Sequence, residues 1–397
     1  MRPPGHTLFV LFGLIGQSLV GCGPPSGGSS SQATSRPRVA LVVYDAGETL
    51  ALLPVVDRLA STEIQVEWVP LTPWAASLLA ANGRSFLPLP EGIEEMPHVL
   101  SREGGQEPSV WIDAFTRSKP DLAILGMVSE AQRRIGAHLR ELGVPTRGIY
   151  DGFQPPDETS IGLRAAQFVD EVWVSTARVR DGFAALGMET VVSGQPTLES
   201  WRRVAEETDA QTVRRTQGVR SHQRVLLFAG QYGPGYEEVL GSFLEAMRDL
   251  LVADSSLFLI LSHHPRTDGQ VERRALSRTF SEPTLAGRAA MMAEGLTTAQ
   301  MATAAEVVLT WTSTVGVQAA FMGKQVIYYS PPETFDSYLI DEGAAMLAEE
   351  ESLEPLLRSA LAHPPSPGEI RERLVSAGYV VDADEVVADL ILAALSR

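Results

Sequence analysis

The sequence predicts an α/β protein with two Rossmann-like domains, each built on a doubly wound parallel sheet. From Arg38 onward, short β-branched runs alternate with amphipathic stretches, as they do when parallel strands are joined by helical crossovers. The alternation pauses over residues 198–221, which are polar and helix-prone, and a new apolar strand begins at Arg224. We expect the carboxyl ends of both sets of strands to face a shared cleft, where such folds bind ligands.

The first predicted domain covers residues 38–197. Val39–Tyr44 is apolar throughout, as expected for a strand covered on both faces. A turn over Asp45–Thr49 is predicted to lead into a helix at Leu50–Leu59. Further strands are predicted at Gln65–Val69, Asp121–Leu125, Thr146–Tyr150, Glu171–Val174 and Thr190–Val192, and further helices at Glu130–Leu142 and Ala177–Leu186.

The second predicted domain covers residues 222–345 and repeats the same pattern after a hinge at 198–221. Its predicted strands are Arg224–Ala229, Leu257–Leu261, Val307–Thr310 and Gln325–Tyr329. The remaining stretch, 346–397, is predicted to supply helices that pack back across the hinge. Its last part, Asp382–Leu395, has the spacing of an amphipathic helix.

Composition narrows the possible functions. The chain has 397 residues and a net charge of −17 at pH 7, which argues against nucleic acid as a partner, because phosphate binding needs a basic face. It contains no H-E-x-x-H, no G-x-S-x-G and no Asp-rich metal loop, so no metal site is predicted.

The only cysteine, Cys22, follows an apolar run at Leu8–Val20. The run is too short to span a bilayer but fits the hydrophobic region of a signal peptide. The motif Leu19-Val20-Gly21-Cys22 resembles the lipobox of bacterial lipoproteins, which implies cleavage before Cys22 and acylation of its thiol. The alternatives are an ordinary secretory leader and a wrongly chosen start codon.

The lipobox resemblance implies a particular organisation and location for the N-terminal segment. Residues 1–21 would be a signal peptide, and residues 22–37, rich in Gly, Pro and Ser, a flexible linker. An acylated Cys22 would hold the protein at the periplasmic face or at the outer membrane. If the leader is misassigned, the protein is cytoplasmic.

Four segments carry a further resemblance. Phe168–Pro196 ends in a Gly-x-Pro turn, Leu226–Gly235 is a strand with a glycine loop, Ser262–Arg266 contains His-Pro-Arg, and Thr312–Ile327 contains a hydroxyl-rich turn and a Gly-Lys strand start. In this order they resemble the B-type glycosyltransferase fold, especially the branch of UDP-N-acetylglucosamine 2-epimerases, polysialyltransferase-like enzymes and glycerophosphotransferases. The resemblance covers about residues 38–345.

The resemblance implies that the second domain binds the diphosphate of a UDP- or CDP-linked sugar, with no cofactor beyond this substrate. The glycine loop would approach the pyrophosphate closely, the His-Pro-Arg turn would donate to phosphate oxygens, and the hydroxyl-rich turn would add donors at a helix N-terminus. The structural alternatives are a positive-φ turn, a helix cap and surface ion pairs. The residues implied are Gly230, Gly233, His264, Arg266, Thr312, Ser313, Thr314 and Gln318.

The sequence departs from the family at one point of the nucleotide site. Related enzymes place a glutamate in the helix after the hydroxyl-rich turn to hold the ribose hydroxyls, whereas this chain has Val317 and Gln318 there. Gln318 can still exchange hydrogen bonds with a hydroxyl, but the carboxylate that would bind both hydroxyls is missing.

Two carboxylates of the first domain are the catalytic candidates. Asp151 ends a predicted strand at the cleft and is the candidate base, with a turn to Gly152 as the structural alternative. Glu48 follows the turn where related transferases place acceptor or base groups. Its structural alternative is a solvated carboxylate at a helix N-terminus.

Two functions follow from these observations. The first is a glycosyltransferase or nucleotide-sugar epimerase of cell-envelope polysaccharide metabolism. The second is a non-catalytic, membrane-tethered lipoprotein that binds an envelope glycan or phosphopolymer through a degenerate transferase cleft. A leader that exports the protein conflicts with the first, because nucleotide sugars are held in the cytoplasm.

Overall fold

The computed structural model describes residues 36–90, 109–157, 160–265, 267–285, 287–333, 335 and 338–396. Cys22, the predicted signal peptide and most of the predicted linker lie outside the described residues, and so does Arg266. The chain from Arg36 onward forms one compact unit. No helix among the described segments has the length and apolar character needed to cross a bilayer.

The first sheet has six strands, all parallel, in the order β2-β1-β3-β4-β5-β6. This doubly wound order confirms the predicted fold class for the first half of the chain. The strands are β1 Arg38–Val43, β2 Gln65–Pro70, β3 Leu122–Gly126, β4 Thr146–Tyr150, β5 Glu171–Val174 and β6 Thr190–Val192.

The second sheet also has six parallel strands, in the order β12-β11-β10-β7-β8-β9. Like the first sheet, it contains one reversal of strand order, here between β7 and β10. This order confirms the second doubly wound unit. The strands are β7 Arg224–Ala229, β8 Leu257–Ser262, β9 Ala289–Met291, β10 Val307–Thr310, β11 Gln325–Tyr329 and β12 Met346–Ala348. The edge strands β9 and β12 were not predicted, because their sequences, Ala-Ala-Met and Met-Leu-Ala, lack the β-branched residues that identified the equally short β6.

Helices cover both faces of the first sheet. Along β1, Val39, Leu41 and Val43 pack in a cluster with α1, α2 and α16, whereas Ala40 and Val42 pack in a second cluster with α3 and α4. The helices of this half are α1 Ala46–Leu59, α2 Pro73–Ala81, α3 Ser109–Arg117, α4 Glu130–Glu141, α5 Ile161–Ala166 and α6 Ala177–Ala185.

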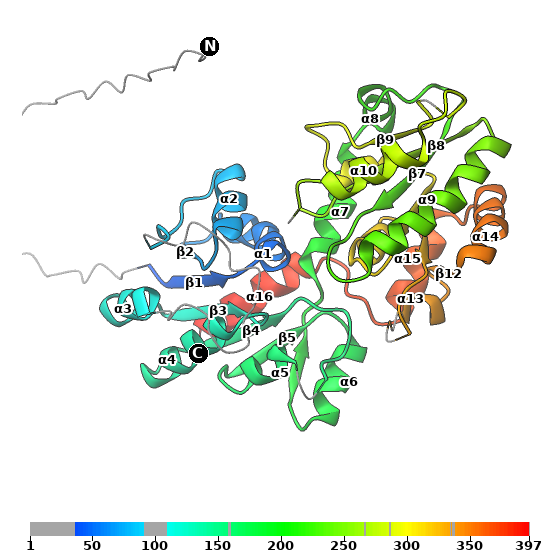
Figure 1. The fold of residues 1–397 in the computed structure, drawn as a ribbon. Helices are drawn as coiled ribbons and strands as arrows, with labels where there is room; N and C mark the ends of the chain where they lie inside the picture. The colour runs from blue at the N-terminus through cyan, green and yellow to red at the C-terminus, as the bar shows by residue number, and fades with distance from the viewer. Residues whose placement is uncertain are drawn as a thin grey trace, which may run out of the picture. The chain divides into compact units, whose positions relative to one another are not determined.

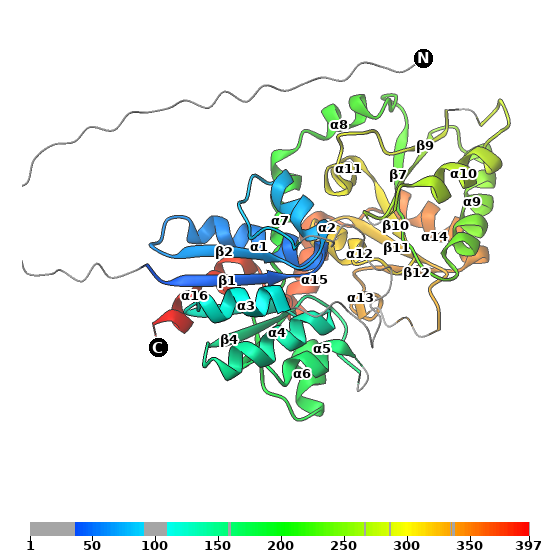
Figure 2. The ribbon, with the colours of Figure 1, turned by 60° about the vertical axis from the view of Figure 1, so that its left-hand side comes forward.

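The second sheet is likewise covered on both faces, as Figure 2 shows. One core cluster joins the sheet to α7, α8, α11, α12 and α15, and the other joins it to α9, α10 and α14. The helices are α7 Pro196–Glu207, α8 Ala210–Thr216, α9 Tyr236–Ala253, α10 Gln270–Thr279, α11 Thr298–Ala304, α12 Val315–Phe321, α13 Tyr338–Asp341, α14 Glu350–Ala362, α15 Pro367–Ser376 and α16 Ala383–Leu395.

The last helix, α16, packs with the first half of the chain. In Figure 1 it runs beside α1, and Val387, Ala388 and Ile391 belong to the same core cluster as β1 and α1. Asp384, at the start of α16, is fully buried and accepts a hydrogen bond from Arg58 of α1 and another from Arg203 of α7. Helices α1, α7 and α16 are therefore joined by apolar packing and by the ion pairs of Asp384 with Arg58 and Arg203.

Candidate functional site

Each sheet has one point at which the strand order reverses. In the first sheet it lies between β1 and β3, and in the second between β7 and β10. Open α/β sheets bind ligands at these points, beyond the carboxyl ends of the strands. The loops that begin at Tyr44, Met127, Gly230 and Trp311 flank the two reversals, and most of the predicted site residues lie in or beside these loops.

At the second reversal, one hydrogen bond joins the two flanking loops. The Gln231 side-chain amide donates from Nε2 to Oγ1 of Thr312 over 3.3 Å. Thr312 is thereby held beside the glycine loop. Gln231 was not predicted, because an amide inside a glycine loop has no sequence signature of its own.

Gly230 is required by packing beneath the glycine loop. A Cβ on Gly230 would lie 2.5 Å from the carbonyl oxygen of Ser262 and 2.8 Å from Oε1 of Glu272. The backbone N–H of Gly230 already donates to Ser262 O over 2.8 Å. Gly230 therefore brings β7 close to β8, and its N–H is engaged within the sheet rather than directed at a ligand.

Gly233 has a different role from Gly230. Its φ is +109°, and no atom of the described residues would lie within 4 Å of a Cβ added there, so the backbone conformation alone favours glycine. Gly235 follows with φ +82° and caps the start of α9 without a side chain. The sequence analysis gave a positive-φ turn as the structural alternative for the glycine loop. Such a turn is present at Gly233 and Gly235.

A buried pair that sequence reasoning missed lies beneath the loop. The Tyr236 hydroxyl donates to Oε1 of Glu272 over 2.8 Å, while Oε2 of Glu272 is buried with no hydrogen-bond partner in the described parts of the chain. Burial, together with the adjacent charge of Glu272, raises the pKa of the Tyr236 phenol. The pair fixes the first residue of α9 to α10 and so supports the loop from below.

His264 lies beside the same loop. Its ring stacks at an angle against Tyr232, with the ring centroids 4.4 Å apart, and its carbonyl accepts hydrogen bonds from the backbone N–H and the hydroxyl of Thr267, both over 2.9 Å. The turn after β8 is thereby ordered and placed next to the loop after β7. Arg266, predicted in the same turn, lies outside the described residues.

The residues of the hydroxyl-rich turn, Thr312–Thr314, have different structural roles. Ser313 is buried, and its hydroxyl accepts from the backbone N–H of Val315 over 3.2 Å. Thr314 precedes α12 and is exposed, and its side chain makes no capping hydrogen bond. Ser313 therefore takes the capping role in this turn, and Thr314 is an exposed residue just before the helix.

The two residues at the position of the family glutamate have different environments. Val317 is buried in the core cluster beneath the second sheet, so it does not face a ligand. Gln318 is half-buried on the same helix. Of the two, only Gln318 remains as a polar group for a ribose.

In the first sheet, Glu48 is completely buried, so its interpretation as a solvated helix-terminal carboxylate is wrong. The helix begins at Ala46, four residues earlier than predicted, because the Asp45 side chain caps it by accepting from the N–H groups of Gly47 and Glu48. Glu48 then lies in the first turn and rests on β3. A Cβ on Gly126 would lie only 1.8 Å from Oε1 of Glu48.

One oxygen of Glu48 is held by two donors. Oε2 accepts from the backbone N–H of Tyr44 over 2.8 Å and from Nε2 of Gln132 over 2.7 Å. The orientation of the Gln132 amide is determined, because its Oε1 accepts from Val128 N, Ser129 N and the Ser129 hydroxyl. Oε1 of Glu48 is buried with no hydrogen-bond partner among the described residues.

The surroundings of Glu48 favour its protonated form. Burial, followed by the charges of Asp45 and Asp151, raises the pKa of the Glu48 carboxyl well above its usual range, although the bonds from Tyr44 and Gln132 oppose the shift.

Asp151 lies next to this group, at the end of β4. A Cβ on Gly47 would lie 2.5 Å from Oδ2 of Asp151, and the backbone carbonyl of Asp151 accepts from Nε2 of Gln195 over 2.9 Å. Burial and then the charge of Asp151 raise the pKa of Tyr150 to about 12. The structure therefore brings the two predicted catalytic carboxylates together and adds Asp45, which was not predicted.

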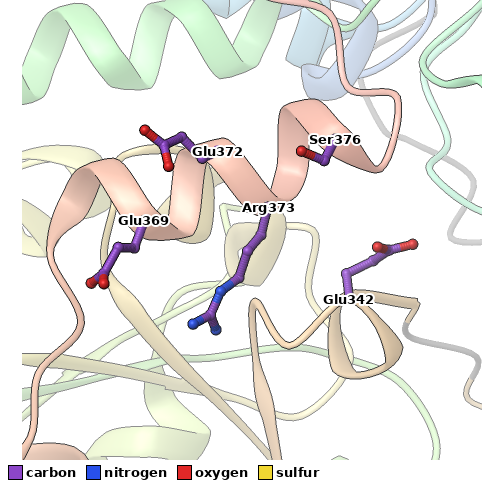
Figure 3. Close-up of a pocket in the computed structure, with 5 residues that line it drawn as sticks. All are labelled: Glu342, Glu369, Glu372, Arg373 and Ser376. Carbon is purple, nitrogen blue, oxygen red and sulfur yellow. The ribbon is translucent and has the colours of Figure 1, made fainter.

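A surface pocket of about 390 Å³ lies elsewhere, between α15 and the segment after α13 (Figure 3). Arg373 at its centre donates from Nη1 to the carbonyl oxygen of Gly343 over 2.6 Å. The pocket contains none of the predicted site residues. Its other lining residues are Glu342, Glu369, Glu372 and Ser376. Among the described parts of the chain, no group of three or more His, Cys, Asp or Glu residues could hold a metal ion.

Comparison with known proteins identifies a family that the second half of the chain resembles. Residues 205–366 match the model of a family described as capsule polysaccharide biosynthesis protein. That segment contains α8, the whole second sheet and all the predicted nucleotide-binding residues. No curated protein matches the chain.

Several solved structures share the fold across nearly their whole length. A UDP-GlcNAc 2-epimerase from Neisseria meningitidis bound to UDP-GlcNAc has 14% sequence identity and a TM-score of 0.71 over 90% of this chain and 100% of its own. A complex of S. aureus MnaA with UDP has 13% identity and a TM-score of 0.69 over 91% and 97%. MurG from Acinetobacter baumannii has 14% identity and a TM-score of 0.57 over 90% and 99%.

These identities are low enough that the solved structures establish the fold and nothing finer. The chain therefore has the B-type glycosyltransferase fold, in a form like that of the UDP-GlcNAc 2-epimerases, and its second half resembles the capsule polysaccharide biosynthesis proteins.

Proposed function

We propose that the protein transfers or epimerises the sugar of a UDP- or CDP-linked donor in the assembly of an envelope polysaccharide. The observation that carries this proposal is the Gln231–Thr312 hydrogen bond, which joins the two loops at the reversal of the second sheet. That reversal is the usual ligand position of the fold. It also lies inside the segment that resembles capsule polysaccharide biosynthesis proteins.

In this proposal the donor diphosphate is bound by the loops after β7, β8 and β10. His264 and Arg266 donate to its oxygens, and the exposed hydroxyl of Thr314 and the hydroxyl of Thr312 add neutral donors. Gln318 contacts the ribose in place of a carboxylate. Gly230 and Ser313 support the site by packing and by capping, as their engaged groups indicate.

Asp151 is the proposed base. In a transfer reaction its carboxylate takes the proton of an acceptor hydroxyl while that oxygen attacks the anomeric carbon, and the nucleoside diphosphate leaves with the electrons of the broken bond. Glu48 does not compete for this role, because it is completely buried and its Oε2 already accepts two hydrogen bonds.

Isothermal titration calorimetry with UDP and CDP tests the donor site directly. Wild type is expected to bind one of them, and His264→Ala to weaken that binding about tenfold, because a hydrogen bond to a charged group contributes about 1.5–3 kcal/mol. His222→Ala is the matched control, since His222 is exposed just before β7. Absence of binding of either nucleotide at millimolar concentration would overturn the proposal.

We also propose that acylated Cys22 anchors the protein to a membrane, on the strength of the lipobox resemblance and the Gly/Pro/Ser-rich segment that follows it. An anchor on the periplasmic side would separate the site from cytoplasmic nucleotide sugars. The second candidate function therefore remains a tethered module that binds an envelope glycan or phosphopolymer.

A specific observation favours that module. The ribose-binding carboxylate of the family is absent, and of its two replacements only Gln318 is outside the core. Titration of UDP-linked sugars against wild type and Gln318→Glu separates the two functions. Binding by the restored variant alone would indicate a degenerate site, whereas binding and turnover by wild type would exclude the module.

A further inference from the structure

We propose that Trp311 is a positioning residue of the nucleotide site. Its side chain joins the loops after β7, β10 and β11 into one unit, so that the donors of the site are arranged before a ligand arrives. Trp311 directly follows β10, at the reversal of the second sheet, and in this role it acts through the loops. The inference rests on the proposed function for the identity of the ligand, a nucleoside diphosphate.

The ring of Trp311 supports the end of the glycine loop. It stacks on Tyr236, the first residue of α9, with the ring centroids 6.2 Å apart and the ring planes inclined by 26°. A Cβ added to Gly235 would lie 3.8 Å from Cη2 of Trp311, so the last glycine of the loop also lies beside the six-membered ring. Tyr236 is fixed in turn by its hydrogen bond to Glu272.

The indole N–H of Trp311 contacts the loop after β11. Nε1 donates to the carbonyl oxygen of Ser330 over 3.1 Å, and the backbone N–H of Ser330 donates to the carbonyl oxygen of Ala348 in β12 over 2.7 Å. Ser330 has φ +42°, in the left-handed region that a residue other than glycine keeps only where its surroundings impose it. The hydrogen bond from Trp311 helps to hold Ser330 in this conformation.

The backbone of Trp311 belongs to the third loop, the one after β10. The next residue, Thr312, accepts the hydrogen bond from Gln231 of the glycine loop over 3.3 Å. The preceding residue, Thr310, donates from its hydroxyl to the carbonyl oxygen of Ala229 at the end of β7 over 3.2 Å. Trp311 is therefore connected to the loop after β7 twice, through its ring and through its neighbours in the chain.

These contacts indicate a role in ordering the loops as well as in packing. Trp311 is half-buried at the edge of a core cluster, whereas Trp173, which fills the core of the first half, is completely enclosed. A diphosphate takes donors from several loops at once, so each loop that is ordered beforehand lowers the cost of binding. Because one rigid indole joins the three loops, loosening any one of its contacts should loosen the others.

Hydrogen exchange measured by mass spectrometry tests this connection without a ligand. Trp311→Phe keeps a ring against Tyr236 and removes the N–H donor to Ser330. We expect faster exchange on both sides of the ring, at the Ser330 amide and at the Tyr236 amide, which donates to Gly233. The expected increase is about threefold to tenfold, the factor that one neutral hydrogen bond contributes.

Trp201→Phe, at a half-buried position of α7, is the matched control and should leave both exchange rates unchanged. The melting temperatures of the two phenylalanine variants are expected to agree, because a positioning role affects the loops and not the core. Calorimetric titration with UDP and CDP gives a second measurement. Trp311→Leu, which removes both the ring and its N–H, is expected to weaken nucleotide binding by about threefold or more.

Three results would overturn the inference. The first is unchanged exchange at both amides in Trp311→Phe, and the second is faster exchange at Ser330 with none at Tyr236. The third is a wild-type nucleotide affinity in Trp311→Leu. If neither nucleotide binds to wild type, the proposed function fails, whereas the exchange rates still decide whether Trp311 joins the loops.

Discussion

Arg58 in α1 donates from Nε to Oδ2 of Asp384 in α16 over 3.0 Å, although 326 positions separate them in the chain. Asp384 is buried, whereas 44% of the Arg58 side chain is exposed. Arg203 of α7 donates to the same oxygen. One buried carboxylate thus ties the end of the chain to the beginning of the first sheet and to the helix that precedes the second.

We expect Asp384→Ala to lower the free energy of unfolding by about 2 kcal/mol. Breaking a buried ion pair usually costs more, but Arg58 and Arg203 can both turn to solvent once the carboxylate is gone. Urea denaturation measures the change. Asp389→Ala, at an exposed position of the same helix, should cost less than about 0.5 kcal/mol, and equal losses in the two variants would contradict the role assigned to Asp384.

Replacing Glu48 with glutamine should make stability less dependent on pH. The pKa of this carboxyl is raised in the folded protein, so its stabilising contribution is complete below the pKa of an unfolded glutamate and is lost as pH rises through the folded pKa. Glutamine resembles the protonated form and does not titrate. Chemical denaturation at intervals from pH 4 to pH 9 should therefore show Glu48→Gln gaining on wild type as pH rises, and parallel curves would refute the assignment.

Gly126→Ala should destabilise the protein through Glu48. The added Cβ would lie 1.8 Å from Oε1, and overpacking of this kind costs about 1–3 kcal/mol. Combining Gly126→Ala with Glu48→Ala removes the collision, so the double variant should be at least about 1 kcal/mol more stable than the sum of the single effects predicts. Additive effects in urea denaturation would show that the glycine serves another purpose.

Glutamate should be tolerated at position 318 and not at position 317. Val317 is buried in the core, and an unpaired carboxylate there should cost about 3 kcal/mol or more. Gln318 is half-buried, and its replacement should change stability by less than about 1 kcal/mol. Thermal melting of the two variants distinguishes these positions, and similar losses would mean that Gln318 also points into the core.

Cys22→Ala should release the protein from membranes without changing its melting temperature, because the compact unit begins at Arg36. Labelling with a palmitate analogue and cell fractionation measure the effect, with a Ser26→Ala variant in the same segment as the control. If wild type is unlabelled and found in the cytosol, the proposed anchor is wrong. The protein would then have access to the nucleotide sugars of the cytoplasm.

Much of the fold was predictable from local pattern. Runs such as Val39–Val43 are apolar at every position because helices cover both faces of the sheet, and this regularity identified ten of the strands. The edge strands β9 and β12 were missed because they contain no β-branched residue, unlike the equally short β6. The early start of α1 was missed because Asp45 acts as its cap, and a turn and a capped helix start share the same residues.

The sequence by itself determined the fold class, the order of the strands along the chain and the loops in which polar residues collect, because these follow from periodicity over neighbouring residues. Tertiary structure alone decided what those polar residues do. Glu48 is buried because Gly126 of β3 leaves room for its carboxyl group, and Gln132, 84 positions away, holds its Oε2. Gly230 supports packing while Gly233 forms the turn, since only one of them lies against β8. Burial and pairing depend on residues distant in the chain, and no local pattern records them.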